Sequence, residues 1–380
     1  MRTKQPLLHI EVYTTLKDIP QETWDRLFNA EIIENYCYQK TLEESHLKEF
    51  TFYYFVAKRN GKIVAIIPAF TSNFSFSTII QGKFQKFILN IQKFLPRFFK
   101  IKILFIGSPT AEELYIGIPE EEDLNKILDK ALKKIFTFAR KKRTSAVLFY
   151  NLTRKQQDLA DYLLRKGFTK MENFPNTVLK INATSIEEFM DSLGKSTRKS
   201  LKRKLNKTSE LVELKTEMSE DVGFIKDRIH ELYLTNFTES DVRFETLTKE
   251  FFQNICRNMP GIAKYFLTYD NTRLVAFNLL MIKNGTAIDK FVGFDTEVSH
   301  KYNLYYTTFI HNIEYCIKNN IRYYQMGITD YEPKIRLGAT LSPLYIYVRL
   351  SNPILNFIGK FFIKSLEPKR FDPTLKNLEY

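Results

Sequence analysis

The chain has 380 residues, of which 44% are hydrophobic and 14% aromatic, and this composition excludes an intrinsically disordered protein. Its formal net charge of +14 indicates anionic partners such as CoA phosphates, lipid headgroups or nucleic acid, without choosing among them. Cys37, Cys256 and Cys316 lie far apart and lack C-x-x-C spacing, so neither a disulfide framework nor a thiolate metal site is indicated.

Neither a secretory signal nor a membrane-spanning segment is visible in the sequence. The first twenty residues lack an apolar run, and no run of about 18 consecutive apolar residues occurs anywhere. We therefore expect a cytoplasmic protein in a reducing compartment.

The first half of the chain predicts a β-hairpin followed by alternating helices and strands. Residues 54–65 read strand, turn, strand around Asn60-Gly61. An acidic run at 120–123 then opens a helix with apolar residues at helical spacing and a basic end. A strand at 146–150, a helix from about Arg154 to Gly167 and a strand at 177–181 follow.

The second half repeats this order. Residues 265–276 align without gaps to residues 54–65, with Asp270-Asn271 at the turn. A second turn, Asn284-Gly285, leads into a strand at 286–294, a helix from about Asn303 to Asn319 and a strand at 322–326. Strands that alternate with helices predict α/β domains, here in tandem.

Several segments resemble the GNAT-related acyltransferases of the Fem-like and predicted N-acyltransferase type. They are IPQETWDRL, LLRKGF, KSTRKSLKRKLNK and the block from FVGFDTEVSHKYNLYY to YEPKIRLGA. The resemblance covers essentially the whole chain. It implies two GNAT-like domains, each a mixed, mostly antiparallel sheet flanked by helices, and acyl or aminoacyl transfer to an amine in a cleft between diverging strands.

Within this frame we expect four parts. They are an N-terminal GNAT-like domain at 1–182, a basic helical connector at 183–217, a C-terminal catalytic GNAT-like domain at 218–350, and an amphipathic tail at 351–380.

The sequence departs from small GNAT acetyltransferases at the junction DTEVSHKYNLYY, which has no glycine for a pyrophosphate loop. Backbone amides at a helix start can still bind phosphate, but close approach is harder without glycine. Acyl-CoA therefore stays open as the donor.

Two carboxylates of one strand are candidate catalytic groups. Asp289 is expected to share a strand face with Phe291, Gly293 and Asp295, opposite Lys290. Asp289 could act as a base or hold the amine, with Asp295 at the strand end where ligands bind in open α/β sheets. The alternative for Asp289 is an edge-strand charge that faces water.

The helix that follows begins with Tyr302, Tyr305 and Tyr306. Their hydroxyls could reach a leaving group or the bound acyl chain, and Tyr302 and Tyr305 are therefore candidate catalytic residues. As core aromatics they need no such role.

Five residues are candidates for binding the donor: Lys334, Arg336, Gly338, Arg198 and Lys202. Lys334 and Arg336, bracketed by Pro333 and Gly338, are expected in an ordered loop that presents two cations, unless they are solvated surface charges. Arg198 and Lys202 lie in a predicted basic helix that could bind membrane phosphates, CoA or tRNA, or could be a solvated linker.

Two segments without acidic residues mix Phe, Ile and Leu with Lys or Arg: residues 84–106 and residues 352–366. Basic amphipathic helices of this kind lie at anionic membrane surfaces, and core-packing helices are the alternative.

No metal and no bound prosthetic group is expected, because the five histidines show no ligand spacing. The sequence also lacks G-x-S-x-G, Walker A and H-E-x-x-H motifs, which excludes the hydrolase, NTPase and zincin readings.

The resulting hypothesis is an N-acyltransferase at the inner face of the cytoplasmic membrane. It would move an acyl group from acyl-CoA or acyl-carrier protein to a lipid-like amine such as a long-chain base, as in bacterial ceramide formation. Two alternatives stay open: a Fem-like transferase that uses aminoacyl-tRNA and a peptidoglycan precursor, and a non-catalytic module for membrane or glycan recognition.

Overall fold

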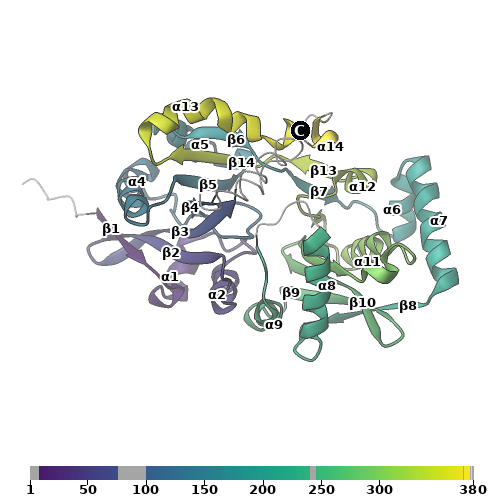
Figure 1. Ribbon diagram of the computed structural model, residues 1–380. Coiled ribbons are helices and arrows are strands. Elements are labelled where there is room, and N and C mark those ends of the chain that lie inside the picture. Colours follow the sequence, from purple (N-terminus) through teal and green to yellow (C-terminus); the bar gives the residue numbers. More distant parts are fainter. Residues whose placement is uncertain (1–7, 76–99, 240–244, 371, 377, 379–380) are drawn as a thin grey trace, which may run out of the picture. The chain divides into compact units, whose positions relative to one another are not determined.

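The computed structural model describes residues 8–75, 100–239, 245–370, 372–376 and 378 (Figure 1). The chain divides into two compact units. Unit 1 contains Met1–Glu43, Leu47–Phe174 and Pro343–Glu379, and unit 2 consists mainly of Pro175–Ser342.

Unit 1 is built on a mixed sheet. Its strands, among the described residues, are β1 (Leu8–Tyr13), β2 (Phe50–Arg59), β3 (Lys62–Ser75), β4 (Lys100–Ile106), β5 (Ala146–Leu152), β6 (Thr169–Glu172) and β14 (Tyr345–Leu350), in the order β1-β2-β3-β4-β5-β14-β6. β4 and β5 are parallel, and the other neighbours are antiparallel.

Helices α1 (Gln21–Leu27), α2 (Tyr36–Glu44), α4 (Leu124–Lys141), α5 (Gln157–Arg165), α13 (Pro353–Ile363) and α14 (Pro373–Lys376) accompany this sheet. The acidic run at 120–123 ends in Asp123, whose side chain accepts a hydrogen bond from the Lys126 amide and caps α4. The apolar residues of α4 are buried, so the helix packs on the sheet through one stripe of apolar side chains.

Unit 2 repeats the architecture. Its described strands are β7 (Asn176–Lys180), β8 (Leu214–Ser219), β9 (Ala263–Asp270), β10 (Arg273–Lys283), β11 (Thr286–Phe294), β12 (Tyr323–Gln325) and β13 (Thr340–Ser342), in the order β13-β7-β12-β11-β10-β9-β8. Its helices are α6 (Ile186–Ser192), α7 (Lys195–Leu211), α8 (Lys226–Glu239), α9 (Lys249–Asn258), α10 (Thr296–Ser299), α11 (Leu304–Lys318) and α12 (Tyr331–Arg336).

The two sheet orders correspond strand for strand when β7 and β14 are exchanged. β14 pairs between β5 and β6, and β7 pairs between β12 and β13. β11 and β12 are parallel, as β4 and β5 are. The hairpins β2–β3 and β9–β10 occupy equivalent places, so the repeat of residues 54–65 in residues 265–276 is structural.

This exchange corrects the expected domain boundaries. The strand expected at the end of the first domain, 177–181, belongs to the sheet of unit 2 as β7. β14, expected in the second domain, and the expected tail from residue 351 belong to unit 1. The expected connector at 183–217 is part of unit 2. Hydrophobic periodicity identifies strands but not their partners, which are long-range.

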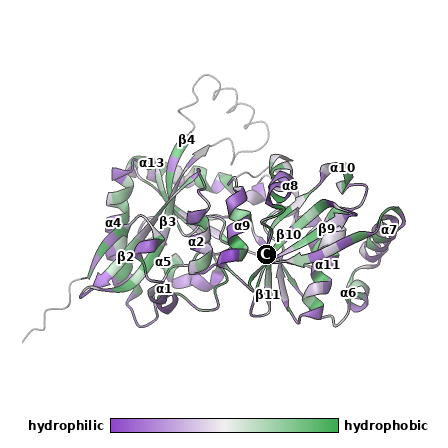
Figure 2. Cartoon of the chain, turned by 90° about the horizontal axis from the view of Figure 1, so that it is seen from below, coloured by the Kyte–Doolittle hydropathy of each residue, from purple (hydrophilic) through white to green (hydrophobic). Residues whose placement is uncertain are grey.

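Helices cover both faces of the sheet in unit 2. α8 contacts β10 and β11, and α9 contacts β9; α11 contacts the same central strands and also α6 and α7. Figure 1 shows α11 and α7 side by side. In Figure 2 the central strands carry hydrophobic residues, whereas the helices alternate hydrophobic and hydrophilic ones, as expected for helices that bury one face.

Gly293 of β11 is required by close packing. A Cβ atom at this position would lie 2.4 Å from Cε1 of Phe277 and 2.8 Å from the backbone carbonyl carbon of Leu232 in α8. A backbone atom cannot move aside as the end of a side chain can, so no other residue fits here without shifting α8.

We therefore expect Gly293→Ala to lower the free energy of unfolding by about 1–3 kcal/mol, as overpacking does. Urea denaturation followed by circular dichroism measures this loss. Gly194→Ala is the control, because no atom lies within 4 Å of its Cβ position, and only a small loss from the altered helix cap is expected. Equal losses in both variants would refute the packing argument.

Candidate functional site

The two parallel strands of unit 2, β11 and β12, are hydrogen-bonded to each other over only a short ladder and then separate. β11 pairs with β12 only through Thr286–Tyr323, Ala287–Tyr324 and Ile288–Gln325. β11 then continues for six more residues to Phe294, whereas β12 ends at Gln325. Asp289 is the first residue of β11 beyond this ladder. We call the place where the two strands separate the fork.

The Asp289 carboxylate is the centre of a buried polar network at the fork. Its Oδ2 accepts a hydrogen bond of 2.7 Å from the Tyr324 hydroxyl and one of 3.1 Å from Nδ2 of Asn278. Nδ2 of Asn312 in α11 donates to the Tyr324 oxygen at 2.9 Å. Asp289 is only 8% exposed. A carboxylate buried in this way requires donors, and β10 and β12 supply them.

A β-bulge corrects the expected strand faces. Leu280 pairs with Asp289 but Leu279 pairs with Phe291, so Lys290 is an extra residue on β11. Asp289 therefore lies on the face of Leu280 and Asn278, whereas Phe291 turns to the opposite face and contacts Tyr233 and Phe251 of α8 and α9. The alternative of a solvated edge-strand charge is also wrong, because Asp289 is buried in a central strand.

Three buried polar atoms of this region have no hydrogen-bond partner among the described residues: the Tyr305 hydroxyl, Oδ1 of Asn278 and Oδ1 of Asn312. Asn278 and Asn312 each use their amide nitrogen in the Asp289 network. Buried polar atoms are nearly always satisfied by protein or by bound molecules. The fork therefore has a donor and two acceptors available to a ligand or to water.

Tyr305, at the start of α11, is held beside this network by aromatic contacts with Phe309, Tyr306 and Phe294. Burial raises the pKa of the Tyr305 hydroxyl, and the nearby charges of Asp330 and Asp289 raise it further. The hydroxyl stays protonated at neutral pH and is a proton donor. Burial and the Asp289 charge likewise keep the pKa of Tyr324 well above its usual value.

Asp295 and Tyr302 are engaged elsewhere. The Asp295 side chain caps α10 through the Glu297 amide and forms ion pairs with Arg228 and Arg273. The Tyr302 hydroxyl donates to Asp270 at 3.0 Å, and this bond raises its pKa. Both groups therefore stabilise the connection from β11 to α11, and their catalytic roles stay a prediction.

The expected loop with two cations is instead the short helix α12. Lys334 and Arg336 are two residues apart on it and do not face each other. Lys334 is buried, and its amine donates to the Thr329 carbonyl at 2.5 Å, near Gly327 and the end of β12. Arg336 is exposed and pairs with Glu332. Gly338 ends the helix with a φ of +92°, which suits glycine.

The basic helix α7 packs against the start of α11. The Thr208 hydroxyl donates to the Tyr302 carbonyl at 2.9 Å, and the Lys204 amine lies 3.5 Å from the centre of the Tyr306 ring. Arg198 pairs with Asp191 of α6 at 3.1 Å, whereas Lys202 is exposed. The solvated-linker alternative therefore does not hold: α7 is a packed helix with an exposed basic side, and its Lys204 contacts Tyr306.

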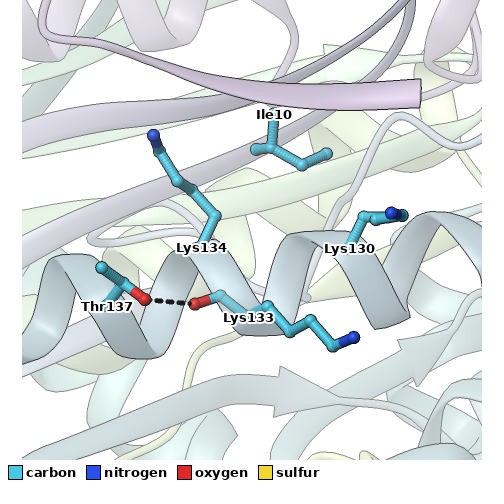
Figure 3. Close-up of a pocket in the computed structure, with 5 residues that line it drawn as sticks. All are labelled: Ile10, Lys130, Lys133, Lys134 and Thr137. Atoms are coloured by element: carbon cyan, nitrogen blue, oxygen red, sulfur yellow. Dashed lines mark hydrogen bonds between the residues drawn. The ribbon is translucent and has the colours of Figure 1, made fainter. Parts of the chain in front are cut away.

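A shallow hollow lies in unit 1 between β1 and α4. Its lining is Ile10, Lys130, Lys133, Lys134 and Thr137, and the Thr137 hydroxyl donates to the Lys133 carbonyl at 2.8 Å (Figure 3). The hollow presents lysine side chains without a carboxylate, so it offers no acid–base pair for acyl transfer. Among the described residues, no cluster of three His, Cys, Asp or Glu side chains could hold a metal ion.

The structure agrees with only one of the two amphipathic helices that were expected at a lipid surface. Residues 84–99 lie outside the described part of the chain, and Lys100–Ile106 is the core strand β4, not a helix. Residues 352–366 do contain the helix α13, with large apolar side chains exposed. No helix within the described residues is long and apolar enough to cross a membrane.

Four residues of the site were missed by the sequence analysis: Asn278, Asn312, Tyr324 and Lys204. Asn278 sits in an apolar run of β10, where a lone amide is a sequence signal for a buried polar contact. Tyr324 alternates with the exposed Tyr323, so the sequence contained no sign of which tyrosine points inward.

Comparison with known proteins agrees with this architecture. Residues 195–334, which run from α7 to α12 and include the fork, match the family model of the acetyltransferase (GNAT) domain. A curated relative, "Putative 8-amino-7-oxononanoate synthase 2" of Mycobacterium tuberculosis, is 23% identical over 323 residues, which are 83% of this chain and 42% of the relative. The chain thus spans less than half of that protein.

Two solved structures share the fold over almost their whole length. The crystal structure of FemX has a TM-score of 0.54 at 12% identity and covers 92% of this chain and 99% of its own. A tandem GNAT protein from the clavulanic acid biosynthesis pathway has a TM-score of 0.53 at 11% identity, with 91% and 99% covered.

These findings define the fold of the protein. The chain has the tandem-GNAT fold of Fem-like proteins, which confirms the predicted fold class and the predicted resemblance. The match of residues 195–334 to the acetyltransferase (GNAT) domain supports an acyltransferase. The fork of β11 and β12 lies inside that domain.

Tyr324→Phe is expected to lower the free energy of unfolding by about 1–3 kcal/mol, because Asp289 loses a donor and Asn312 loses its acceptor in the interior. Thermal and urea denaturation measure the change. Tyr323→Phe on the same strand is the matched control; its side chain is 44% exposed, and a change within about 0.5 kcal/mol is expected. Equal stability of the two variants would show that the network contributes nothing.

Proposed function

We propose that the protein is an N-acyltransferase that forms an amide by direct transfer of an acyl group to the amine of a lipid-like acceptor. Acyl-CoA or acyl-carrier protein is the donor. The observation that carries the proposal is the position of the buried Asp289 carboxylate, with Tyr305 beside it, where β11 and β12 separate within the GNAT domain.

The reaction needs a neutral amine, an acceptor for its proton and a donor for the leaving group. The amine nitrogen attacks the thioester carbonyl and forms the C–N bond, and the tetrahedral intermediate then restores the carbonyl and breaks the C–S bond, which releases the thiolate. We assign the proton from the amine to the Asp289 carboxylate. The Tyr305 hydroxyl, kept protonated by its raised pKa, would give its proton to the departing thiolate.

The surroundings of Asp289 suit this role. Tyr324 and Asn278 hold the carboxylate in one orientation from two neighbouring strands, so no reorganisation is needed before proton transfer. The free acceptor atoms of Asn278 and Asn312 could receive hydrogen bonds from the incoming amine. After one turnover, Asp289 returns its proton and Tyr305 recovers one through solvent.

We assign the anionic part of the donor to α7. Lys199, Lys202, Arg203 and Lys207 are exposed on this helix, and Lys204 lies over Tyr306, the neighbour of Tyr305. Phosphates bound along this surface would bring the thioester towards Tyr305. The connection from β11 to α11 has no glycine loop and contains α10 instead, so side-chain cations would take over part of the phosphate binding.

The choice of a lipid-like amine, such as a long-chain base, rests on the apolar surface of α13. A long-chain acceptor resides in a bilayer, and an enzyme that modifies it must reach that surface. Ceramide-type N-acylation is the sharpest form of this proposal.

A Fem-like activity is the second candidate, supported by the FemX-like fold and the basic α7. Aminoacyl-tRNA would then replace the thioester, and a peptidoglycan precursor would replace the lipid amine. RNase treatment would abolish only this activity.

The chemistry is tested with purified protein, palmitoyl-CoA and sphinganine in mixed micelles. The release of free thiol is measured, and the amide product is detected by mass spectrometry. Asp289→Asn keeps the size of the side chain but removes the proton acceptor, and we expect kcat to fall by about 10²–10⁴-fold. Thermal denaturation checks that the variant is folded.

Glu297→Gln is the control for this experiment, because it makes the same change in a carboxylate that is 75% exposed. Its kcat should equal that of the wild type. Full activity of a folded Asp289→Asn would remove Asp289 as the base. Thioester turnover absent in the wild type, with aminoacyl transfer present, would favour the Fem-like candidate, and absence of both would favour a non-catalytic recognition module.

The donor site generates a separate prediction. Lys202→Glu combined with Arg203→Glu should raise KM for palmitoyl-CoA by about tenfold at low ionic strength, with less effect at high salt. The KM for an acyl N-acetylcysteamine thioester, which lacks phosphates, should not change. Lys62→Glu, an exposed charge reversal in unit 1, is the control. An equal rise in KM for both donors would contradict phosphate binding by α7.

A further inference from the structure

Helix α13 exposes a continuous apolar face. Of the ten large hydrophobic residues that are exposed in the described part of the chain, five lie on this one helix: Ile354 (71%), Leu355 (57%), Phe357 (71%), Ile358 (49%) and Phe362 (68%). At about 100° per residue, these five fall within an arc of about 160°. Exposed apolar residues scattered singly are ordinary, but a contiguous face marks an interaction surface.

The other side of α13 is fixed to unit 1. The Asn356 side chain accepts a hydrogen bond from the Leu350 amide at 2.9 Å and donates one to the Gly167 carbonyl at 3.2 Å. Gly359 lies against Leu350, and Ile363 is buried. Asn352 caps the helix through the amides of Ile354 and Leu355. The helix, which packs against β14 (Figure 1), is therefore a rigid part of its unit, and its apolar face is exposed.

The charges around this face indicate the occupant. Residues 343–366 contain no Asp or Glu, whereas Lys360 and Lys364 are exposed beside the apolar arc. Arg370 is a further exposed cation a short distance along the chain. A second copy of the chain would bring like charges together, but an anionic lipid surface would take the apolar side chains among its acyl chains and the lysines at its phosphates.

We propose that α13 is the element that docks the protein on an anionic lipid bilayer, with its axis along the membrane plane and its apolar face in the headgroup region. Ile354, Phe357, Ile358 and Phe362 enter the boundary of the acyl chains. Lys360 and Lys364 contact lipid phosphates. This proposal does not rest on the transfer chemistry, since docking requires no turnover.

The test is flotation of the full-length protein with vesicles of equal parts phosphatidylcholine and phosphatidylglycerol, beside vesicles of pure phosphatidylcholine. The wild type should bind the anionic vesicles. Phe357→Ser with Phe362→Ser should weaken this binding at least about tenfold. Lys360→Glu with Lys364→Glu should weaken binding to the anionic vesicles only.

The matched control is Phe224→Ser with Leu211→Ser, because these residues of unit 2 are 78% and 48% exposed but lie outside α13. This pair should bind as the wild type does. Phe357→Trp adds a direct readout, since the only natural tryptophan, Trp24, is buried. Brominated acyl chains should quench the new tryptophan.

Three results would overturn the proposal: no binding of the wild type to anionic vesicles, equal binding by the serine pair in α13 and the serine pair in unit 2, or a wild-type oligomer that the serine pair in α13 converts to monomers. The last result, seen by analytical ultracentrifugation, would assign the face to a second copy of the chain. Turnover of a soluble short-chain amine, measured in parallel, separates a failure of docking from a failure of the proposed reaction.

Discussion

The site of unit 2 depends on one buried carboxylate. Asp289 lies in a central strand at the point where the parallel ladder of β11 and β12 ends, and a charge in that position must be hydrogen-bonded. Tyr324 of β12 and Asn278 of β10 meet this requirement directly, and Asn312 of α11 orients Tyr324. The same contacts that stabilise the charge hold three strands and a helix in register around the fork.

The two units share an architecture but differ at this position. Counted from the first pair of each parallel ladder, Thr286–Tyr323 and Ile103–Ala146, the residue of unit 1 that corresponds to Asp289 is Ile106. Ile106 is fully buried in an apolar core. The duplicated fold thus has a buried carboxylate at this position in one copy and an apolar core residue in the other, and the latter copy carries α13. This is the division expected when function depends on grafted sites and not on the fold itself.

The cationic side chains of the protein also differ in their surroundings. Lys334 is buried and bonded to a carbonyl, and Arg336 is paired on the surface of α12, so neither is left to bind a ligand as a pair. The exposed cations of α7 lie next to the aromatic start of α11, and those of α13 lie beside an apolar face. The net charge of the chain is therefore consistent with two distinct anionic partners, a phosphorylated donor and a lipid surface.

Local pattern was enough to predict the hairpins, the helices α4 and α11, the tandem repeat and Asp289 as a candidate, because turn residues and hydrophobic periodicity act over short distances. The sequence could not determine the exchange of β7 and β14, since strand partners are set by packing between distant segments. It also could not determine the bulge at Lys290, which reverses the face of Phe291 relative to Asp289. Nor could it separate Tyr324 from Tyr323, or Lys334 from Arg336. Only the tertiary structure decides which member of each pair is buried, because burial depends on neighbours far away in the chain.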